Sequence, residues 1–425
     1  MADHKLTGFG FGPIQSGLFV AEAYKSDSFS RIVVAEVDRQ LVDAVRRSGG
    51  SYRVNVATDT GIETLRVRGI EIFDPVDPSD RDRLISTLKE ATEIATALPS
   101  VDFYTKGDPS VASLIAEGIA NSTAPAKIVY TAENDNHAAE TLDREVTAID
   151  TEKPSNVQFL NTVIGKMSRT VTDPEEIELL GLEPVADNLP RAFLVEEFNR
   201  IMVTRATIGG FEPGIKTFVQ KADLLPFEEA KLYGHNAIHT LLGCLGQLKG
   251  YRYMMDLKDD KELMDIAYRA FIAESGGGLI KKHSDLGDPL FTREGYKEYA
   301  KDLLARMTNP YLADTVERAV RDPLRKLGYN DRLFGTMRLA LSQGIEPVNM
   351  ALGAMAATAL LVKQDRGSKI KHLIGDISWQ ELTRDQLERV VRSLWNGRFG
   401  SYDKQLIALV HSQRERLKHI CGTSH

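Results

Sequence analysis

The sequence is poor in cysteine and has no long apolar run, and each shortage excludes a class of protein. The two cysteines, Cys244 and Cys421, cannot form a disulfide framework or a thiolate metal cluster, which fits a reducing compartment. The longest apolar run, residues 350–362, is shorter than the roughly 20 residues that cross a bilayer, so it predicts a buried helix. Because the N-terminus also lacks the basic-then-apolar pattern of a signal peptide, we expect a cytoplasmic protein without a membrane segment.

Charge of neither sign dominates any part of the chain. The 53 Lys and Arg residues and the 60 Asp and Glu residues are interspersed, and the formal net charge is −7. Without a basic run, neither a nucleic-acid groove nor an anionic membrane surface is expected as a partner. The expected ligands are small molecules. A chain of 425 residues is long enough for two domains, as a monomer or a small homo-oligomer.

Short apolar runs alternate with helical patterns over the first ~150 residues, as in a parallel sheet with crossover helices. The expected strands are residues 31–37, 52–56, 127–132 and 156–165, and the expected helices are residues 38–49 and 109–120. After about residue 195 the pattern becomes mainly helical. Within that part, the run 274–278 (ESGGG) predicts a helix end or a flexible turn.

Residues 5–19 run from a short strand through glycines into a helical pattern, which is where a dinucleotide-binding fold holds the pyrophosphate. Gly10 and Gly12 permit a tight turn and a close backbone approach. Pro13 suits the first helical turn, and Ile14 follows it. We expect these four residues to contact the cofactor. Gln15 stands where the usual fingerprint has its third glycine, so a glycine-rich hairpin is the alternative interpretation.

The strand at residues 31–37 ends in acidic residues at the separation expected for a ribose contact. Glu36 is the better candidate, because a carboxylate accepts hydrogen bonds from both ribose hydroxyls and repels a 2′-phosphate, which favours NAD over NADP. Asp38 is instead expected to be the N-cap of the next helix. The sequence thus predicts an α/β Rossmann-type NAD-binding domain over residues 1–190 and a mostly α-helical substrate and catalytic domain over residues 191–425.

Lys231, Asn236 and His239 lie on one face of a helix expected around residues 227–250, because each residue of an α-helix turns by about 100°. A lysine amine, a side-chain amide and an imidazole are groups that can transfer a hydroxyl proton or bind the hydroxyl oxygen. The same face carries glycines that indicate close packing or a ligand, namely Gly243, Gly246 and Gly250. A solvated polar stripe on a surface helix is the alternative interpretation.

His235 and His239 are spaced i and i+4, which would let two imidazoles ligate one metal ion. The zinc-protease motif with that spacing needs a general-base carboxylate at its second position, and Asn236 cannot be a base. Because no third ligand is evident from spacing, no metal is expected.

The chain resembles the polyol-specific long-chain dehydrogenases, the mannitol dehydrogenase family, over nearly its whole length. The lysine, asparagine and histidine of that family's catalytic signature correspond to Lys231, Asn236 and His239. Other similar stretches are residues 41–54, 131–137, 273–283 and 308–333. Among the members, the chain is most similar to those that oxidise mannitol 1-phosphate.

This resemblance implies a metal-independent enzyme that moves hydride between a polyol and a ketose, most simply between mannitol 1-phosphate with NAD and fructose 6-phosphate with NADH. Lys231 would be the general acid and base once burial or positive neighbours lower its pKa. Asn236 and Asn134 would donate hydrogen bonds to the reacting oxygen, and His239 would orient the substrate. Ala97 and Leu98 would contact the cofactor through their backbone.

Two departures from the family pattern concern the substrate. Gly165-Lys166 replaces a common Asp-Arg pair, and Gln15-Ser16 replaces the Gly-Arg of the sugar-phosphate enzymes. Among the basic residues, Arg306 and Lys282 are the first candidates for binding a phosphate or carboxylate. The alternatives are a non-phosphorylated hexitol and fructose, a hexuronate such as fructuronate or tagaturonate, or a nicotinamide-binding sensor without turnover.

Overall fold

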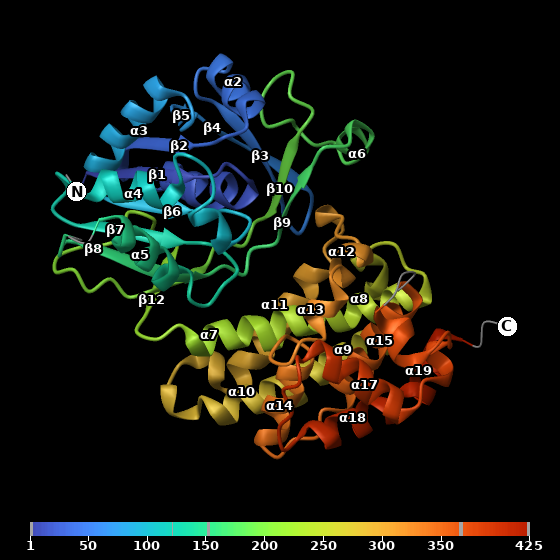
Figure 1. Ribbon diagram of the computed structural model, residues 1–425. Helices are drawn as coiled ribbons and strands as arrows, with labels where there is room; N and C mark the ends of the chain where they lie inside the picture. Colours follow the sequence, from blue (N-terminus) through green and yellow to red (C-terminus); the bar gives the residue numbers. More distant parts are fainter. Residues whose placement is uncertain (1–2, 121, 151–153, 365–368, 423–425) are drawn as a thin grey trace. The chain divides into compact units, whose positions relative to one another are not determined.

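The computed structural model describes residues 3–120, 122–150, 154–364 and 369–422. The chain divides into two compact units, Met1–Phe227 and Glu228–His425 (Figure 1). This division lies beyond the 190/191 boundary expected from the sequence. The reason is that residues 192–221 contribute further strands to the sheets of the first unit rather than opening the helical unit.

The first unit is built on a sheet whose strand order is β12-β11-β8-β7-β6-β1-β2-β5. The strands from β8 to β5 are parallel to their neighbours, while β11 pairs antiparallel with β8. Their bounds are β1 His4–Phe9, β2 Phe29–Ala35, β5 Glu71–Phe73, β6 Glu93–Thr96, β7 Lys127–Thr131, β8 Val157–Val163, β11 Ile201–Thr204 and β12 Phe218–Lys221. Because β1 lies between β2 and β6, the strand order reverses there, and ligands of such folds bind at this reversal.

Helices pack on the faces of this sheet, and a second sheet lies to one side of it (Figure 1). The helices are η1 Gln15–Val20, α1 Ala21–Ser26, α2 Arg39–Arg47, α3 Pro78–Glu90, α4 Val111–Ala120, α5 Ala138–Ile149 and α6 Pro174–Leu179. The second sheet has the order β4-β3-β10-β9, with bounds Ile62–Val67, Tyr52–Ala57, Ala192–Glu196 and Ser168–Val171. Successive side chains of a strand point to opposite faces of the sheet. In β2, Val33 belongs to the hydrophobic core on one face and Val34 to the core on the other. The expected α/β class of this unit is confirmed.

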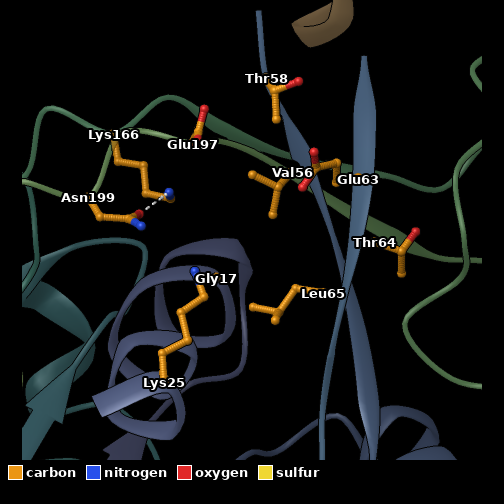
Figure 2. Close-up of a pocket in the computed structure, with 10 residues that line it drawn as sticks. All are labelled: Gly17, Lys25, Val56, Thr58, Glu63, Thr64, Leu65, Lys166, Glu197 and Asn199. Atoms are coloured by element: carbon orange, nitrogen blue, oxygen red, sulfur yellow. Dashed lines mark hydrogen bonds between the residues drawn. The ribbon is translucent and has the colours of Figure 1, made fainter. Parts of the chain in front are cut away.

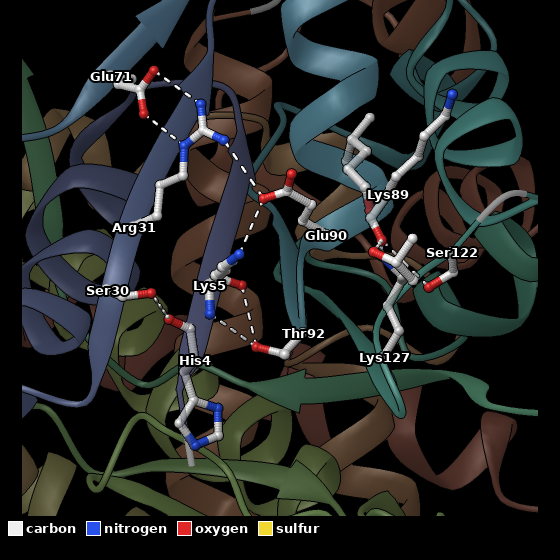
Figure 3. A network of polar contacts seen from close by, with 12 residues as sticks. His4, Lys5, Ser30, Arg31, Glu71, Lys89, Glu90, Thr92, Ser122 and Lys127 are labelled. Atoms are coloured by element: carbon white, nitrogen blue, oxygen red, sulfur yellow. Dashed lines mark hydrogen bonds and ion pairs between the residues drawn. The ribbon is translucent and has the colours of Figure 1, made fainter. Parts of the chain in front are cut away.

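The amino ends of the parallel strands carry a polar network (Figure 3). Lys5 at the start of β1 pairs with Glu90 at 3.0 Å, and Arg31 of β2 pairs with Glu71 at 2.6 Å. Lys127 at the start of β7 is fully buried, and its ammonium donates to the backbone carbonyls of Leu88 and of the residue after it. The charged side chains at the amino ends of the strands bind one another or the end of α3. This edge of the sheet therefore stabilises the fold.

The second unit is helical (Figure 1). Its helices are α7 Leu225–Glu229, η3 Ala230–Asn236, α8 Ala237–Lys249, α9 Lys261–Arg269, η5 Ala270–Gly276, α10 Gly277–Lys282, α11 Arg293–Met307, α12 Val316–Val320, α13 Pro323–Lys326, α14 Phe334–Ser342, α15 Val348–Gln364, α16 Lys369–Ile374, α17 Arg384–Leu394, α18 Asp403–Ser412 and α19 Arg414–Cys421. The expected buried helix is α15, whose residues 350–361 are buried. In the described ranges, no helix is long and apolar enough to cross a membrane.

The glycine run 276–278 lies inside a helix and does not end one, contrary to the expectation from its composition. A Cβ on Gly276 would lie 2.6 Å from the ring of Tyr296, and a Cβ on Gly277 would lie 2.8 Å from Ile345. The glycines are therefore explained by close packing of neighbouring helices, which overrides their poor helix propensity.

A largely buried arginine links two helices of the second unit and contacts a tryptophan at the end of a third. Arg338 of α14 donates from Nε to Oδ1 of Asp403 in α18 at 2.8 Å, and its guanidinium lies 4.4 Å from the ring centroid of Trp395. The Asp403 side chain is fully buried and also accepts from the backbone N–H of Gly400 at 2.6 Å. Removing the arginine would leave a buried carboxylate without its counter-charge.

We expect Arg338→Met to lower the free energy of unfolding by about 3–5 kcal/mol, the usual cost of breaking a buried ion pair. Arg269→Met is the matched control, because Arg269 pairs with Asp265 at 2.8 Å on an exposed surface and should cost less than about 1 kcal/mol. Urea denaturation followed by tryptophan fluorescence measures both. Equal costs for the two variants would contradict a central role for Arg338.

Candidate functional site

The carboxyl edge of the parallel strands collects the cofactor residues expected from the sequence. Gly10 follows β1, Glu36 follows β2, Ala97 and Leu98 follow β6, and Asn134 comes shortly after β7. Parallel neighbours end at the same edge, so these residues lie together at the strand-order reversal. The Asn134 side chain is on the exposed surface of this edge.

The glycine loop has the shape that a close backbone approach requires. Gly10 has a φ of 80°, and a Cβ there would lie 2.9 Å from the Ala97 carbonyl oxygen. Around Gly12, by contrast, a Cβ would meet nothing within 4 Å. Pro13 and Ile14 lead into the π-helix η1. Gly10 is thus needed by the protein's own packing, whereas Gly12 leaves space for a ligand.

The missing third glycine of the fingerprint is compensated elsewhere. Gln15 is completely buried, and a Cβ on Gly8 would lie 1.9 Å from its Nε2 atom. Gly8, on β1, therefore makes the room that a glycine at position 15 would otherwise provide. The neighbouring Gly17 keeps the helix close to the second sheet, where a Cβ would lie 2.7 Å from Val195.

Glu36 ties the glycine loop to the end of β2. Its Oε2 accepts from the backbone N–H of Phe11 at 2.7 Å, and its Oε1 accepts from those of Val37 and Asp38, each at 2.8 Å. A carboxylate offers about four acceptor positions, so one remains for a ribose hydroxyl. Asp38 caps α2 by accepting from the backbone N–H groups of Gln40 and Leu41, as expected.

A buried glutamate that was not among the residues expected at the site organises the neighbouring loops. Glu133 accepts from the Leu98 backbone N–H at 2.8 Å, from the Thr96 hydroxyl at 2.9 Å and from the Tyr104 hydroxyl. Burial raises the pKa of its carboxyl group. Glu133, the residue before Asn134, therefore ties the end of β7 to the loop after β6. Only its position at a strand end could have drawn attention to it.

Lys166 has a structural role, although its charge had suggested a place near the substrate. Its ammonium donates to the Phe198 carbonyl at 3.0 Å and also to the Glu196 carbonyl and the Asn199 side chain. Figure 2 shows the hydrogen bond between Lys166 and Asn199 beside a cavity of about 200 Å³, which Lys25 also lines. Lys25 in turn binds Glu22 at 3.1 Å, so both cations are held by the protein itself.

In the second unit, Lys231 and Asn236 lie in a π-helical turn, Ala230–Asn236. A π-helix bonds residue i to i+5, so residues five apart lie on adjacent turns of the same face. Lys231 and Asn236 are five residues apart, which in the α-helix expected from the sequence leaves about 140° between them around the axis. The expectation of an α-helix was therefore wrong over Ala230–Asn236, and the π turn brings these two residues closer to one face. Regular α-helix resumes at Ala237 and carries His239. Single π turns of this kind are often found at functional sites.

Positive charge concentrates around this turn. Burial, and next the nearby Arg332, lower the pKa of Lys231 to about 8, while Glu228 opposes the shift. Burial also holds the pKa of His235 well below its usual value, with help from Arg306 and the other cations, so His235 is neutral near pH 7. The lysine amine is therefore poised to gain or lose a proton near neutral pH.

His239 binds a carboxylate: its Nε2 lies 2.9 Å from Oδ2 of Asp314. The glycines expected on the same face are explained by packing. A Cβ on Gly243 would lie 2.5 Å from the Ala319 Cβ, and one on Gly246 would lie 2.9 Å from the Leu257 side chain. Gly250 ends α8 with a φ of 86°. The helix is buried from Ala237 to Gly246 apart from His239, which is partly exposed like Lys231 and Asn236.

The two basic residues ranked first for substrate binding have different surroundings. Arg306 is largely buried near His235 and donates to Asp302 at 3.1 Å. Lys282 is more exposed and pairs with Glu229 at 2.6 Å. Arg332, which the sequence ranked no higher than other basic residues, is buried and acts on both Lys231 and His235. No feature of the sequence distinguished it.

His235 and His239 have ring centroids 6.4 Å apart. Among the residues with described positions, no group of three or more His, Cys, Asp or Glu side chains is arranged to hold a metal ion.

Comparison with known proteins bears on both units. Residues 223–393 match the family model described as the mannitol dehydrogenase C-terminal domain. A mannitol-1-phosphate 5-dehydrogenase of Halalkalibacterium halodurans is 28% identical over 86% of this chain and 90% of its own length. That of Geobacillus thermodenitrificans is 29% identical over 76% of this chain and 78% of its own.

Two solved structures share the fold. A D-sorbitol dehydrogenase in substrate-free form has a TM-score of 0.76 at 15% identity, covering 99% of this chain and 94% of its own. The Pseudomonas fluorescens mannitol 2-dehydrogenase, in a ternary complex with NAD and D-mannitol, has a TM-score of 0.70 at 16% identity and the same coverage.

A parallel α/β domain followed by a helical unit with a lysine of lowered pKa is typical of a two-domain, long-chain dehydrogenase. The second unit carries the match to the mannitol dehydrogenase C-terminal domain, and the chain is similar over most of its length to relatives named mannitol-1-phosphate 5-dehydrogenase, at 25–29% identity. The resemblance noted from the sequence is confirmed.

We expect Gly12→Ala to leave the fold intact and to weaken NADH binding about 10- to 100-fold, because the added methyl group has space in the protein but not beside a bound phosphate. Gly61→Ala, also at a site where a Cβ meets nothing within 4 Å, is the control. Fluorescence titration with NADH measures the affinity. Unchanged affinity in Gly12→Ala would favour the plain hairpin interpretation of this loop.

Proposed function

We propose that this chain is an NAD-dependent polyol dehydrogenase that interconverts mannitol 1-phosphate and fructose 6-phosphate. The observation that carries the proposal is the partly exposed Lys231 in one helical run with Asn236 and His239, with desolvation and Arg332 lowering the pKa of the lysine to about 8. The match of residues 223–393 to the mannitol dehydrogenase C-terminal domain and the names of the relatives support the same activity.

The first unit would hold the cofactor. Gly10 and Gly12 would face the pyrophosphate, Glu36 the adenosine ribose, and the backbone of Ala97 and Leu98 the rest of the dinucleotide. The open space at Gly12 and the remaining acceptor position of Glu36 fit this role. NAD, when bound, supplies the hydride acceptor for alcohol oxidation. The negative charge of Glu36 would disfavour the 2′-phosphate of NADP.

The second unit would move the proton. In alcohol oxidation the neutral amine of Lys231 takes the hydroxyl proton, and in ketose reduction the ammonium returns it to the carbonyl oxygen. Asn236 would donate a hydrogen bond to that oxygen as negative charge develops on it, and Asn134 is proposed for the same role. His239 would hold a neighbouring hydroxyl of the substrate and so fix its orientation.

The charges near Lys231 favour an anionic substrate. Arg306 and Arg332 are both largely buried near the lysine turn, and each has a carboxylate partner, Asp302 at 3.1 Å and Asp331 at 2.9 Å. Together with Lys231 they make the surroundings of the turn positive, which would attract a sugar phosphate more than a neutral hexitol. A hexuronate such as fructuronate or tagaturonate is also an anion and is the second candidate, whereas the relatives' names support the phosphate.

We expect Lys231→Ala to lower turnover about 10²- to 10⁴-fold with NADH affinity retained, because the proton-transfer group is lost and the cofactor site is not. The exposed Lys301, which pairs with Glu298 at 3.0 Å, provides the control variant Lys301→Ala. In the unmodified enzyme, oxidation should rise with pH and level off above a pKa of about 8, since the neutral amine is the base. Reduction should fall over the same range. Unchanged turnover in Lys231→Ala would support the sensor alternative.

We expect fructose 6-phosphate to be the best substrate in a panel that also contains fructose, fructuronate and tagaturonate, because it combines a ketone with a dianionic phosphate. Oxidation of NADH and NADPH, followed by absorbance, measures each rate. NADH should be preferred. If a hexuronate reacts while fructose 6-phosphate is inert, the phosphate assignment is wrong, and if none reacts, the enzyme proposal fails.

A further inference from the structure

One carboxylate beside the proposed substrate site has no role in the proton transfer described above. Asp314 lies in the segment between the short helix η8, Pro310–Leu312, and α12, and its side chain is buried. Its Oδ2 lies 2.9 Å from His239 Nε2, and its Oδ1 accepts from Arg318 Nη1 at 2.6 Å. Both oxygens are thus committed to specific partners.

The backbone around Asp314 is held as firmly as the side chain. Its carbonyl accepts from the Met254 N–H at 2.8 Å, and the next residue, Thr315, forms an isolated β-bridge with Tyr253. The preceding residue, Ala313, has a φ of 46°, a left-handed conformation that costs a non-glycine residue about 1–2 kcal/mol. The packing of Ala319 on Gly243 holds α12 against α8, which carries His239.

The electrostatics favour a charged Asp314. Burial alone would raise the pKa of its carboxyl group, but the contacts with His239 and Arg318 outweigh burial and lower the pKa well below its usual value. Asp314 is therefore a carboxylate and only an acceptor, so the proton between it and His239 belongs to the imidazole. A neutral imidazole that donates from Nε2 keeps its Nδ1 as an acceptor.

We propose that Asp314 is a positioning residue that fixes His239 in the tautomer with the proton on Nε2. His239 would then accept a hydrogen bond from a polyol hydroxyl through Nδ1. This inference rests on the proposed function, in which His239 orients the substrate. Arg318 holds the other oxygen of Asp314 and keeps the carboxylate from rotating away. The relay Arg318–Asp314–His239 thus sets how the substrate is presented to Lys231.

The test is Asp314→Asn, combined with His239→Ala in a double-mutant cycle. We expect Asp314→Asn to reduce kcat/KM for the active polyol about 10- to 100-fold, the range for a lost hydrogen bond to a charged group, with NADH affinity unchanged. In the His239→Ala background the same change should cost little, because Asp314 then has no imidazole to orient. Asp265→Asn, on the exposed surface, is the control.

A spectroscopic measurement keeps the inference testable apart from turnover. Nitrogen NMR of labelled histidine should show His239 with its proton on Nε2 in the unmodified protein and a changed tautomer population in Asp314→Asn. A proton on Nδ1 in the unmodified protein, or equal costs of Asp314→Asn with and without His239, would overturn the inference. If no polyol reacts while the Nε2 tautomer is seen and depends on Asp314, the proposed function fails and the positioning of His239 stands.

Discussion

Residues 225–249 form one continuous helix in which the backbone hydrogen bonds change from the α to the π pattern and back. This change sets which side chains of the proposed site share a face. Over Ala230–Asn236 the backbone forms a π turn, which is rare in proteins and has to be held by its surroundings. Gly234 allows this, because a Cβ there would lie 2.8 Å from the Tyr296 hydroxyl. The Thr336 hydroxyl donates to the Tyr233 carbonyl at 3.2 Å. Tertiary packing thus offsets the cost of the π turn and sets which side chains share a face.

Buried charge is handled in opposite ways by the two units. In the first unit, the carboxylates of Glu36 and Glu133 accept hydrogen bonds from backbone N–H groups of the loops that would hold a cofactor. These bonds stiffen the loops before any ligand binds. In the second unit, cations gather around Lys231 and lower its pKa. The first arrangement favours a rigid binding edge, and the second favours proton transfer and an anionic ligand.

Much of the fold could be predicted from the sequence. The strands β2, β3, β7 and β8, the helices α2 and α4 and the buried helix α15 lie where apolar periodicity placed them, because period and burial are local properties of the chain. The domain boundary could not be placed correctly, since β11 and β12 are short and pair with residues distant in sequence. The glycines 276–278 suggested a helix end, and the close packing of Tyr296 on Gly276 and of Ile345 on Gly277 explains why the helix continues.

The sequence by itself determined the residue types and spacings of the site: the glycine loop, the acidic end of β2, and Lys231, Asn236 and His239. The tertiary structure decided which of these residues have protein partners. Gly8 makes room for Gln15 where the third glycine is missing, and Lys166 donates hydrogen bonds to backbone carbonyls. Asp314 lies against His239, and Arg332 lies near Lys231. The physical reason is that desolvation and charge–charge interactions depend on distances between residues far apart in the chain, which spacing along the sequence does not specify.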